Sequence, residues 1–145
     1  MSVTKAIHIL VVDDEPDVEP MFRQKFRRDI KAQKIDFHFE LSAAAALSYL
    51  ESSEVRAEAT LILSDINMPG MNGLELLRVI KEKYPDSTVF MVTAYGDEQS
   101  RKVAIDYGAD GFISKPVDFD RLKQDVFNLA KSTDRERALS FVSTC

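Results

Sequence analysis

The feature that most constrains this chain is a regular alternation of short apolar runs with helix-like segments. The runs Ile7–Val12, Leu61–Leu63 and Val89–Val92 are almost wholly apolar, which is typical of strands covered on both faces. Between them, apolar residues recur at the spacing of one helix face. Because each crossover between parallel strands is right-handed and packs a helix back onto the sheet, the alternation predicts an α/β fold with helices on both faces of a parallel sheet.

The apolar stripe after the first strand predicts one continuous helix. Its members recur every four residues and are Val18, Phe22, Phe26 and Ile30. Asp17 is the expected N-cap of this helix. Pro20 falls in its first turn, where a missing N–H group costs little.

The second strand differs from the others because its apolar residues alternate with polar ones. They are Ile35, Phe37, Phe39 and Leu41. One face of this strand is therefore expected to be exposed to solvent, which is typical of a strand at the edge of a sheet. The strand order 2-1-3-4-5 puts the second strand at an edge and leaves a ligand-binding crevice between the first and third strands, beyond their carboxyl ends.

The remaining elements complete five strands and five helices. Strands are expected over 88–92 and 111–114, and helices over 43–50, from Leu74 to Tyr84, over 97–107, and along the stripe Phe119, Leu122, Val126 and Leu129. Ser42 and Gly108 are the expected N-cap and C-cap of two of these helices. The charged residues after Lys131 lack a core stripe and are interpreted as a tail or linker.

Composition narrows the class of function. The chain has 145 residues, which suits one domain. With 19 basic against 24 acidic residues its net charge is −5, so direct binding of nucleic acid is not expected. No run is long enough to span a membrane, and the one cysteine, Cys145, excludes a disulfide within the chain. These features predict a cytoplasmic protein.

Three aspartates follow strands that the predicted order brings together. Asp13 and Asp14 come directly after the first strand, and Asp65 follows the third. Each alone reads as a turn or cap residue. Three carboxylates in one crevice repel each other unless a cation neutralises them, and hard oxygen ligands favour Mg²⁺. The sequence therefore predicts a divalent metal site.

A hydroxyl and an ammonium group are expected at the same edge of the sheet. Thr93 ends the fourth strand and Lys115 ends the fifth. A metal-neutralised acidic pocket with one lysine suits a phosphoryl group, which a carboxylate attacks at phosphorus. Asp65 is the expected nucleophile.

Four motifs in this order resemble the receiver domain of two-component response regulators. They are Ile9–Pro16, Asp65–Gly73, Thr93–Tyr95 and Ser114–Pro116. The resemblance covers roughly residues 6 to 131 and implies a flavodoxin-like (βα)5 fold. We accordingly expect a receiver domain over 1–131 and a charged tail or start of a linker over 132–145. A chain of this length leaves no room for an effector domain, so output is expected to pass to a separate protein unless the chain is part of a longer one.

The resemblance also implies roles for individual residues. Asp65 would accept a phosphoryl group from a sensor histidine kinase or a histidine phosphotransfer protein and become an aspartyl phosphate. Asp14 and Asp65 would bind Mg²⁺ directly and Asp13 mainly through water, and Asn67 would give its backbone carbonyl. Lys115 would contact the phosphoryl group and precede a cis peptide bond to Pro116.

A switch is implied as well. Thr93 would move its hydroxyl toward the phosphoryl group, and Phe112 would turn toward the core in response. Phe112 lacks the hydroxyl of a tyrosine, so we expect its outer position to be weakly anchored. Asn67 and Tyr95 would modulate the lifetime of the phosphorylated state. The expected partners are the phosphodonor, at Pro16 and the first helix, a downstream effector protein, and a second copy of the chain after phosphorylation.

Two other hypotheses about the function remain. An Mg²⁺-dependent phosphotransferase or phosphatase of the haloacid dehalogenase type needs an aspartate two residues after its nucleophile, where this chain has Asn67. Such an enzyme also encloses its substrate under an inserted cap, for which the short loops leave no room. A pseudo-receiver that binds partners without phosphate would not require Asp13, Asp14, Asp65 and Lys115 together. We therefore expect a phosphoacceptor and not an enzyme with an external substrate.

Overall fold

A computed structural model describes residues 6–57, 60–94 and 97–129 of the chain. The chain divides into two compact units, Met1–Lys115 and Pro116–Cys145, which are described separately. In the second unit, residues 119–129 form the predicted last helix. The tail predicted over 132–145 and Tyr95 lie outside the described residues. No helix among the described residues is long and apolar enough to cross a membrane.

The first unit contains a five-stranded parallel sheet in the order β2-β1-β3-β4-β5, as predicted. The strands are β1 (Ile7–Val12), β2 (Ile35–Glu40), β3 (Thr60–Asp65), β4 (Thr88–Ala94) and β5 (Gly111–Lys115). All six residues of β3 are buried, whereas β2 alternates at its start between the buried Ile35 and Phe37 and the exposed Asp36. Leu41, predicted to continue this alternation, lies outside β2 and is 54% exposed.

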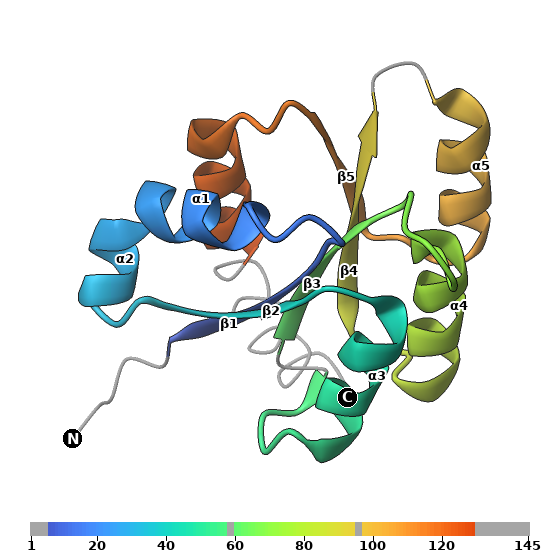
Figure 1. Cartoon of the computed structure of the whole chain (residues 1–145), viewed down its shortest axis with the longest axis horizontal. Coiled ribbons are helices and arrows are strands. Elements are labelled where there is room, and N and C mark those ends of the chain that lie inside the picture. The colour runs from blue at the N-terminus through green and yellow to red at the C-terminus, as the bar shows by residue number, and fades with distance from the viewer. Residues whose placement is uncertain (1–5, 58–59, 95–96, 130–145) are drawn as a thin grey trace, which may run out of the picture. The chain divides into compact units, whose positions relative to one another are not determined.

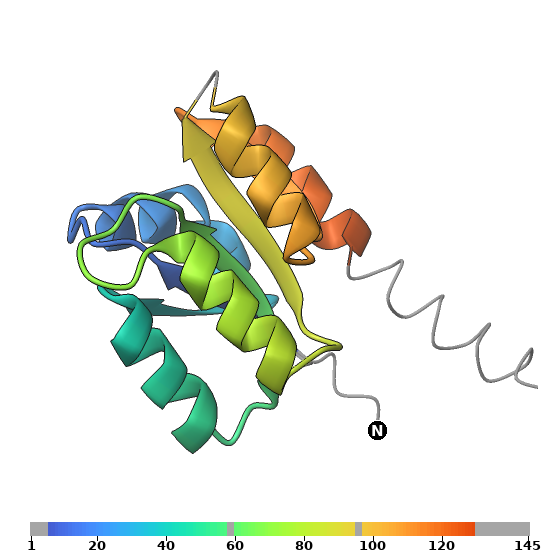
Figure 2. The same cartoon turned by 90° about the vertical axis from the view of Figure 1, so that its right-hand side faces the viewer.

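Helices cover both faces of the sheet (Figures 1 and 2). On one face, α3 (Ala43–Ser52), α4 (Gly73–Lys83) and α5 (Glu98–Asp106) pack through one apolar cluster against β1, β3 and β4. The cluster includes Val12, Ile62, Met91, Leu77 and Ala104. On the other face, Phe22 of α1 (Val18–Lys25) contacts Phe37 of β2 edge to face, with ring centroids 5.8 Å apart. The α/β class with a doubly wound sheet is therefore confirmed.

The prediction of one continuous first helix was wrong. Helical geometry is interrupted at Phe26 (φ −104°, ψ 19°), and a second short helix, α2 (Arg27–Lys31), follows. The Phe26 side chain is fully buried, and its ring lies 5.1 Å from that of Phe37. Burial of this ring against the sheet outweighs continuation of regular helix, which four-residue spacing cannot reveal. Asp17 stands at the predicted N-cap, but its side chain makes no capping hydrogen bond.

Other predicted helix ends are confirmed. The Ser42 hydroxyl accepts a hydrogen bond from the N–H of Ala45 at 3.1 Å at the start of α3. Gly108 follows α5 with φ +98°, a backbone conformation that glycine adopts without strain. Its N–H donates to the carbonyl of Ile105, and the next N–H donates to that of Ala104, which is the Schellman pattern. These ends fix the turn from α5 into β5.

Candidate functional site

The three predicted aspartates meet at the carboxyl ends of β1 and β3. Val12 pairs with Ser64 in the register of these neighbouring strands, so the next residue of each, Asp13 and Asp65, lies at the same edge. One carboxylate oxygen from each of Asp13, Asp14 and Asp65 lies within 4.8 Å of the others. Asp65 is buried, and the other two are partly buried. The sheet topology thus produces the acidic cluster that strand order predicts.

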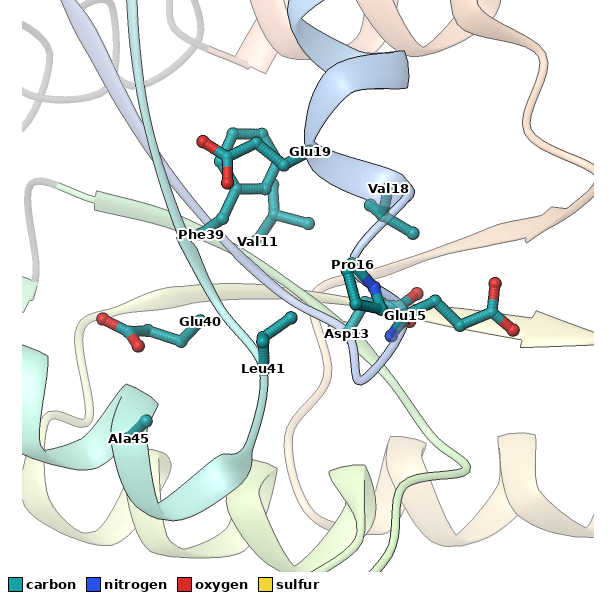
Figure 3. A pocket seen from close by; sticks show the side chains of 10 residues that line it. All are labelled: Val11, Asp13, Glu15, Pro16, Val18, Glu19, Phe39, Glu40, Leu41 and Ala45. Atoms are coloured by element: carbon teal, nitrogen blue, oxygen red, sulfur yellow. Dashed lines mark hydrogen bonds between the residues drawn. The ribbon is translucent and has the colours of Figure 1, made fainter.

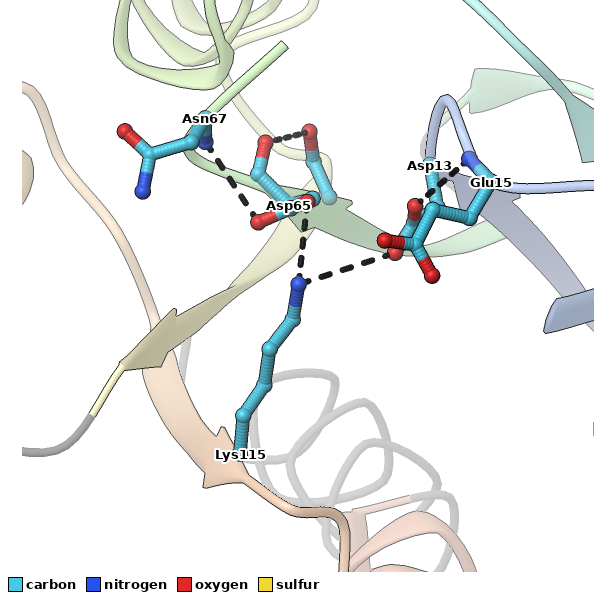
Figure 4. Close-up of polar contacts among 6 residues, drawn as sticks. Asp13, Glu15, Asp65, Asn67 and Lys115 are labelled. Atoms are coloured by element: carbon cyan, nitrogen blue, oxygen red, sulfur yellow. Dashed lines mark hydrogen bonds and ion pairs between the residues drawn. The ribbon is translucent and has the colours of Figure 1, made fainter.

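Lys115 reaches this cluster from the last position of β5. Its Nζ lies 3.0 Å from Oδ2 of Asp65 and 3.9 Å from Oδ2 of Asp13 (Figure 4). Burial lowers the pKa of Lys115, but the hydrogen bond and charge of Asp65, with the charges of Asp13 and Glu15, outweigh burial and raise that pKa. Lys115 is therefore a permanent positive charge at neutral pH, placed against the buried carboxylate.

The carboxylate of Asp13 lies in an environment that disfavours its negative charge. Its Oδ1 accepts a hydrogen bond from the N–H of Glu15 at 3.0 Å, which fixes the carboxylate in the loop (Figure 4). Burial is the largest cause that raises the pKa of Asp13, the charges of Asp65 and Asp14 add to it, and the Glu15 N–H and Lys115 oppose it. The net pKa is raised, so the ionised form is disfavoured until a further cation arrives.

The donor set fits Mg²⁺. Three hard carboxylate oxygens converge, and the nearby Lys115 supplies only one positive charge against three negative ones. Of the two oxygens of Asp65, Oδ2 is held by Lys115, while Oδ1 accepts a long contact of 3.4 Å from the N–H of Asn67. Oxygen ligands with room for water suit Mg²⁺ better than zinc, which prefers nitrogen and sulfur.

The backbone beneath Asp65 imposes a requirement that sequence reasoning missed. A Cβ atom on Gly73, the first residue of α4, would lie 2.0 Å from the carbonyl oxygen of Asp65. The N–H of Gly73 also donates to the carbonyl of Ile66 at 2.8 Å. A glycine is required at this position because the start of α4 packs directly on the backbone of Asp65.

Thr93 and Phe112 lie on the opposite face of the sheet from the Asp65 side chain. Thr93 is buried near the end of β4, level with Ser114, and no contact among the described residues joins its hydroxyl to Asp65 or Lys115. Phe112 is half-buried and packs against the apolar cluster under α4 and α5. Four of the five predicted side chains thus come together, and Thr93 stands at the same edge without joining them.

A hollow of about 450 Å³ opens beside the acidic cluster (Figure 3). Its lining combines apolar and acidic side chains: Val11, Pro16, Val18, Phe39, Leu41 and Ala45 with Asp13, Glu15, Glu19 and Glu40. It lies between the start of α1 and the end of β2. The hollow therefore suits a partner side chain that is apolar along its stem and basic at its tip.

The two histidines contact residues outside the acidic cluster. His8 Nδ1 lies 3.1 Å from Oδ2 of Asp36 on the neighbouring strand. His38 stacks on Tyr49 with ring centroids 3.7 Å apart and contacts Glu40. Both link strand β2 to its neighbours.

Comparisons with known proteins agree on one family. Residues 9–127 match the family model of the response regulator receiver domain. The chain is 32% identical over 117 residues to the response regulator protein PilR of Pseudomonas aeruginosa, covering 79% of this chain and 24% of PilR. It is 32% identical over 132 residues to the TorCAD operon transcriptional regulatory protein TorR of Escherichia coli K12, covering 90% of this chain and 53% of TorR.

Solved structures agree with this match. The signal receiver domain of an HD domain-containing protein from Pseudomonas fluorescens Pf-5 superposes with a TM-score of 0.79 at 28% identity, covering 95% of this chain and 96% of that one. This chain spans about a quarter of PilR and about half of TorR. The likeness therefore concerns one module of those longer proteins.

Proposed function

Because this chain belongs to the family of response regulator receiver domains, we propose that Asp65 accepts a phosphoryl group from a sensor histidine kinase or a histidine phosphotransfer protein. The observation that carries the proposal is the placement of Lys115 Nζ at 3.0 Å from the buried Asp65 carboxylate, beside Asp13 and Asp14. Phosphoryl transfer to an aspartate needs a nucleophilic carboxylate, a positively charged ammonium group and a pair of acids that bind a metal ion.

In the proposed reaction, a carboxylate oxygen of Asp65 attacks the phosphorus of a phosphohistidine. The new O–P bond forms as the P–N bond breaks, and the electron pair of that bond returns to the imidazole nitrogen. Lys115 turns its ammonium from the free carboxylate to the phosphoryl oxygens. Burial of Asp65 limits water at the acyl phosphate.

Asp14, Asp65 and the backbone carbonyl of Asn67 would hold Mg²⁺ directly, and Asp13 would hold it mainly through water. The ion supplies positive charge to the phosphoryl oxygens where charge develops in the transition state. The raised pKa of Asp13 supports this assignment, since the carboxylate is kept in a position that only a cation makes favourable.

We propose that the signal leaves the site through Thr93 and Phe112. Thr93 and Phe112 lie on the same face of the sheet, because Thr93 pairs with Ser114 and strand residues two apart share a face. Movement of the Thr93 hydroxyl toward a phosphoryl group on Asp65 would open space into which Phe112 turns. The surface formed by α5 and β5 would then change shape and bind a different partner.

The partners follow from the same surfaces. The acidic and apolar hollow beside Asp13 and Pro16 supports docking of the phosphodonor at the start of α1. An effector protein or a second phosphorylated copy of the chain would bind the Phe112 face. We propose that the protein is cytoplasmic. We also propose that residues 1–131 bind neither nucleic acid nor a membrane directly.

A phosphatase or phosphotransferase of the haloacid dehalogenase type is the second candidate. It would need an acid two residues after Asp65, where the chain has Asn67, whose side-chain amide cannot act as a general acid or base. We therefore propose that the chain is not an enzyme acting on an external substrate, but turns over only its own aspartyl phosphate. The predicted cis peptide between Lys115 and Pro116 stays a prediction.

Intact mass after incubation with acetyl phosphate tests the proposal. We expect one phosphoryl adduct that requires Mg²⁺ and is absent from Asp65→Asn, while Asp36→Asn, an aspartate on the edge strand, keeps it. An adduct that persists in Asp65→Asn would overturn the assignment. Release of phosphate from many small phosphate esters would favour the enzyme instead.

A further inference from the structure

The side chain of Arg101 covers the ring of Phe112. The guanidinium carbon of Arg101, on α5, lies 4.5 Å from the centroid of the Phe112 ring, on β5. A guanidinium within about 6 Å of an aromatic face is attracted by the ring quadrupole. We propose that Arg101 is a positioning residue that holds Phe112 in the half-buried position it has in this structure, called here the outer position, and thereby opposes the phosphorylated form of the site. The inference rests on the proposed function of Asp65 and of the Phe112 switch.

The two sides of the Phe112 ring meet different surroundings. Phe112 pairs in register with Met91 of β4 and packs against the apolar cluster under α4 and α5. Arg101 lies one helical turn before Ala104, which is fully buried in that cluster, so Arg101 is on the side of α5 nearest the sheet. The ring thus contacts both the apolar cluster and a cation, and in the proposed switch a turn of the ring farther into the core moves it away from Arg101.

The backbone that carries Phe112 is fixed, so the side chain is the part able to move. Oδ2 of Asp110 accepts hydrogen bonds from the N–H of Val89 and from Nζ of Lys81, both at 2.8 Å. A Cβ atom on Gly111 would lie 2.9 Å from the Phe90 ring, so β5 and β4 are in close contact at this point. A change in the position of Phe112 therefore occurs by rotation of its side chain.

Arg101 is available for this role. Within residues 6–57, 60–94 and 97–129 its guanidinium makes no ion pair, and the stacking on Phe112 is the contact that orients it. The contact replaces the hydroxyl anchor that a tyrosine would have at this position. We therefore propose that the anchor of Phe112 comes from Arg101 on the neighbouring helix and not from a polar group on the ring itself.

The sign of the effect follows from linkage. A contact made only in the outer form lowers the population of the inner form, and a ligand that binds the inner form is weakened by the same factor. A cation–π contact at a half-exposed site corresponds to a roughly two- to five-fold change in that equilibrium. Removal of Arg101 should therefore tighten binding of a phosphoryl mimic at Asp65.

The test is calorimetric titration of the full chain with beryllofluoride in the presence of Mg²⁺. We expect Arg101→Gln to tighten binding about two- to five-fold, and Lys102→Gln, which removes the same charge from an exposed neighbour on α5, to leave it unchanged. Loss of a positive charge by itself would weaken binding of an anion. A tightening thus separates release of Phe112 from general electrostatics.

A double-mutant cycle with Phe112→Leu identifies the partner of Arg101. Leucine keeps the apolar volume but has no aromatic face, so Arg101→Gln should have no effect in this background. In the wild type, the Nε–H resonance of Arg101 should also lose its ring-current shift when beryllofluoride binds. Equal or weaker binding by Arg101→Gln, or an equal gain in the Phe112→Leu background, would overturn the inference while leaving Asp65 as the acceptor. Absence of beryllofluoride binding by the wild type would instead overturn the proposed function.

Discussion

Asp13 is the residue at which folding and function conflict most clearly. Its carboxylate is partly buried beside Asp14 and Asp65, and its pKa is raised above the usual value. An acid whose pKa is higher in the folded than in the unfolded state destabilises the fold when it is ionised. Ionised Asp13 therefore destabilises the metal-free protein, and a bound cation would offset this cost.

Asp13→Asn should stabilise the metal-free protein because it removes one of the repelling charges. We expect a gain on the order of 1 kcal/mol, or about 4 °C in the melting temperature, measured by thermal unfolding with chelator present. Asp17→Asn is the matched control, since Asp17 is exposed in the same loop and makes no capping hydrogen bond. A lower melting temperature for Asp13→Asn than for the wild type would contradict the interpretation that ionised Asp13 destabilises the metal-free protein.

The gain from Asp13→Asn should depend on pH. Below the unfolded pKa of about 3.8, Asp13 is protonated in both states and the two proteins should be equally stable. As the pH rises through the raised folded pKa, the wild type ionises against its neighbours and the difference should grow to a plateau. Urea unfolding at a series of pH values measures this, and a difference that shrinks with rising pH would exclude the assigned cause.

Gly73→Ala should be severely destabilising, because the new methyl group meets the backbone oxygen of Asp65 at 2.0 Å and no side chain can yield. We expect a loss of about 3 kcal/mol or more in urea unfolding. Gly70→Ala should cost only about 1 kcal/mol, since Gly70 has φ +75° but open space around its Cα. Similar losses at both positions would mean that backbone freedom, and not close approach, makes Gly73 necessary.

The residues of the site differ in how far the sequence predicts them. Asp13, Asp14, Asp65 and Lys115 were predictable because strand ends at one sheet edge follow from the apolar pattern. Gly73 and Arg101 were not, since close backbone approach and stacking across elements depend on packing that no local pattern encodes.

At the scale of elements, the strand order was predictable and the first helix was not. The positions of the strands were predicted but not all their bounds, since β3 covers Thr60–Asp65 and not only Leu61–Leu63, and β2 ends at Glu40, before Leu41. Buried runs and one alternating strand are sufficient to define the sheet. The interruption at Phe26 depends on how its ring fits against Phe37 across the sheet. Four-residue spacing is the same in one helix and in two helices that continue each other.

Phe26→Ala tests the importance of that packing. The side chain is fully buried among aromatic rings, so its removal should cost about 3–5 kcal/mol in urea unfolding. Met21→Ala, on the exposed side of α1, should change stability by less than about 0.5 kcal/mol. A small loss at Phe26 would mean that α1 and α2 contribute little to the core.

At the scale of the whole molecule, the described fold and the family match cover most of the chain, while this chain spans only part of its relatives. The chain therefore corresponds to one module of those longer proteins, the response regulator receiver domain. Its stability and its chemistry are linked through the acidic cluster, since a ligand that binds only the folded state stabilises it.

Mg²⁺ should raise the melting temperature of the wild type. At a concentration about 100 times its dissociation constant the stabilisation should be about 2.7 kcal/mol, and chelator should reverse it. Asp13→Asn should lose most of this response because one of the three carboxylates around the ion is gone, although it starts from a higher melting temperature. An equal response of both proteins would show that the ion binds elsewhere.

Borohydride reduction of the phosphorylated protein, followed by peptide mass spectrometry, tests whether Asp65 is the phosphoacceptor. An aspartyl phosphate is reduced to homoserine, which marks the modified position permanently. The account predicts homoserine at residue 65 only, and only after incubation with a phosphodonor and Mg²⁺. Reduction at another aspartate, or a stable phosphate on serine, threonine or histidine with Asp65 unmodified, would contradict it.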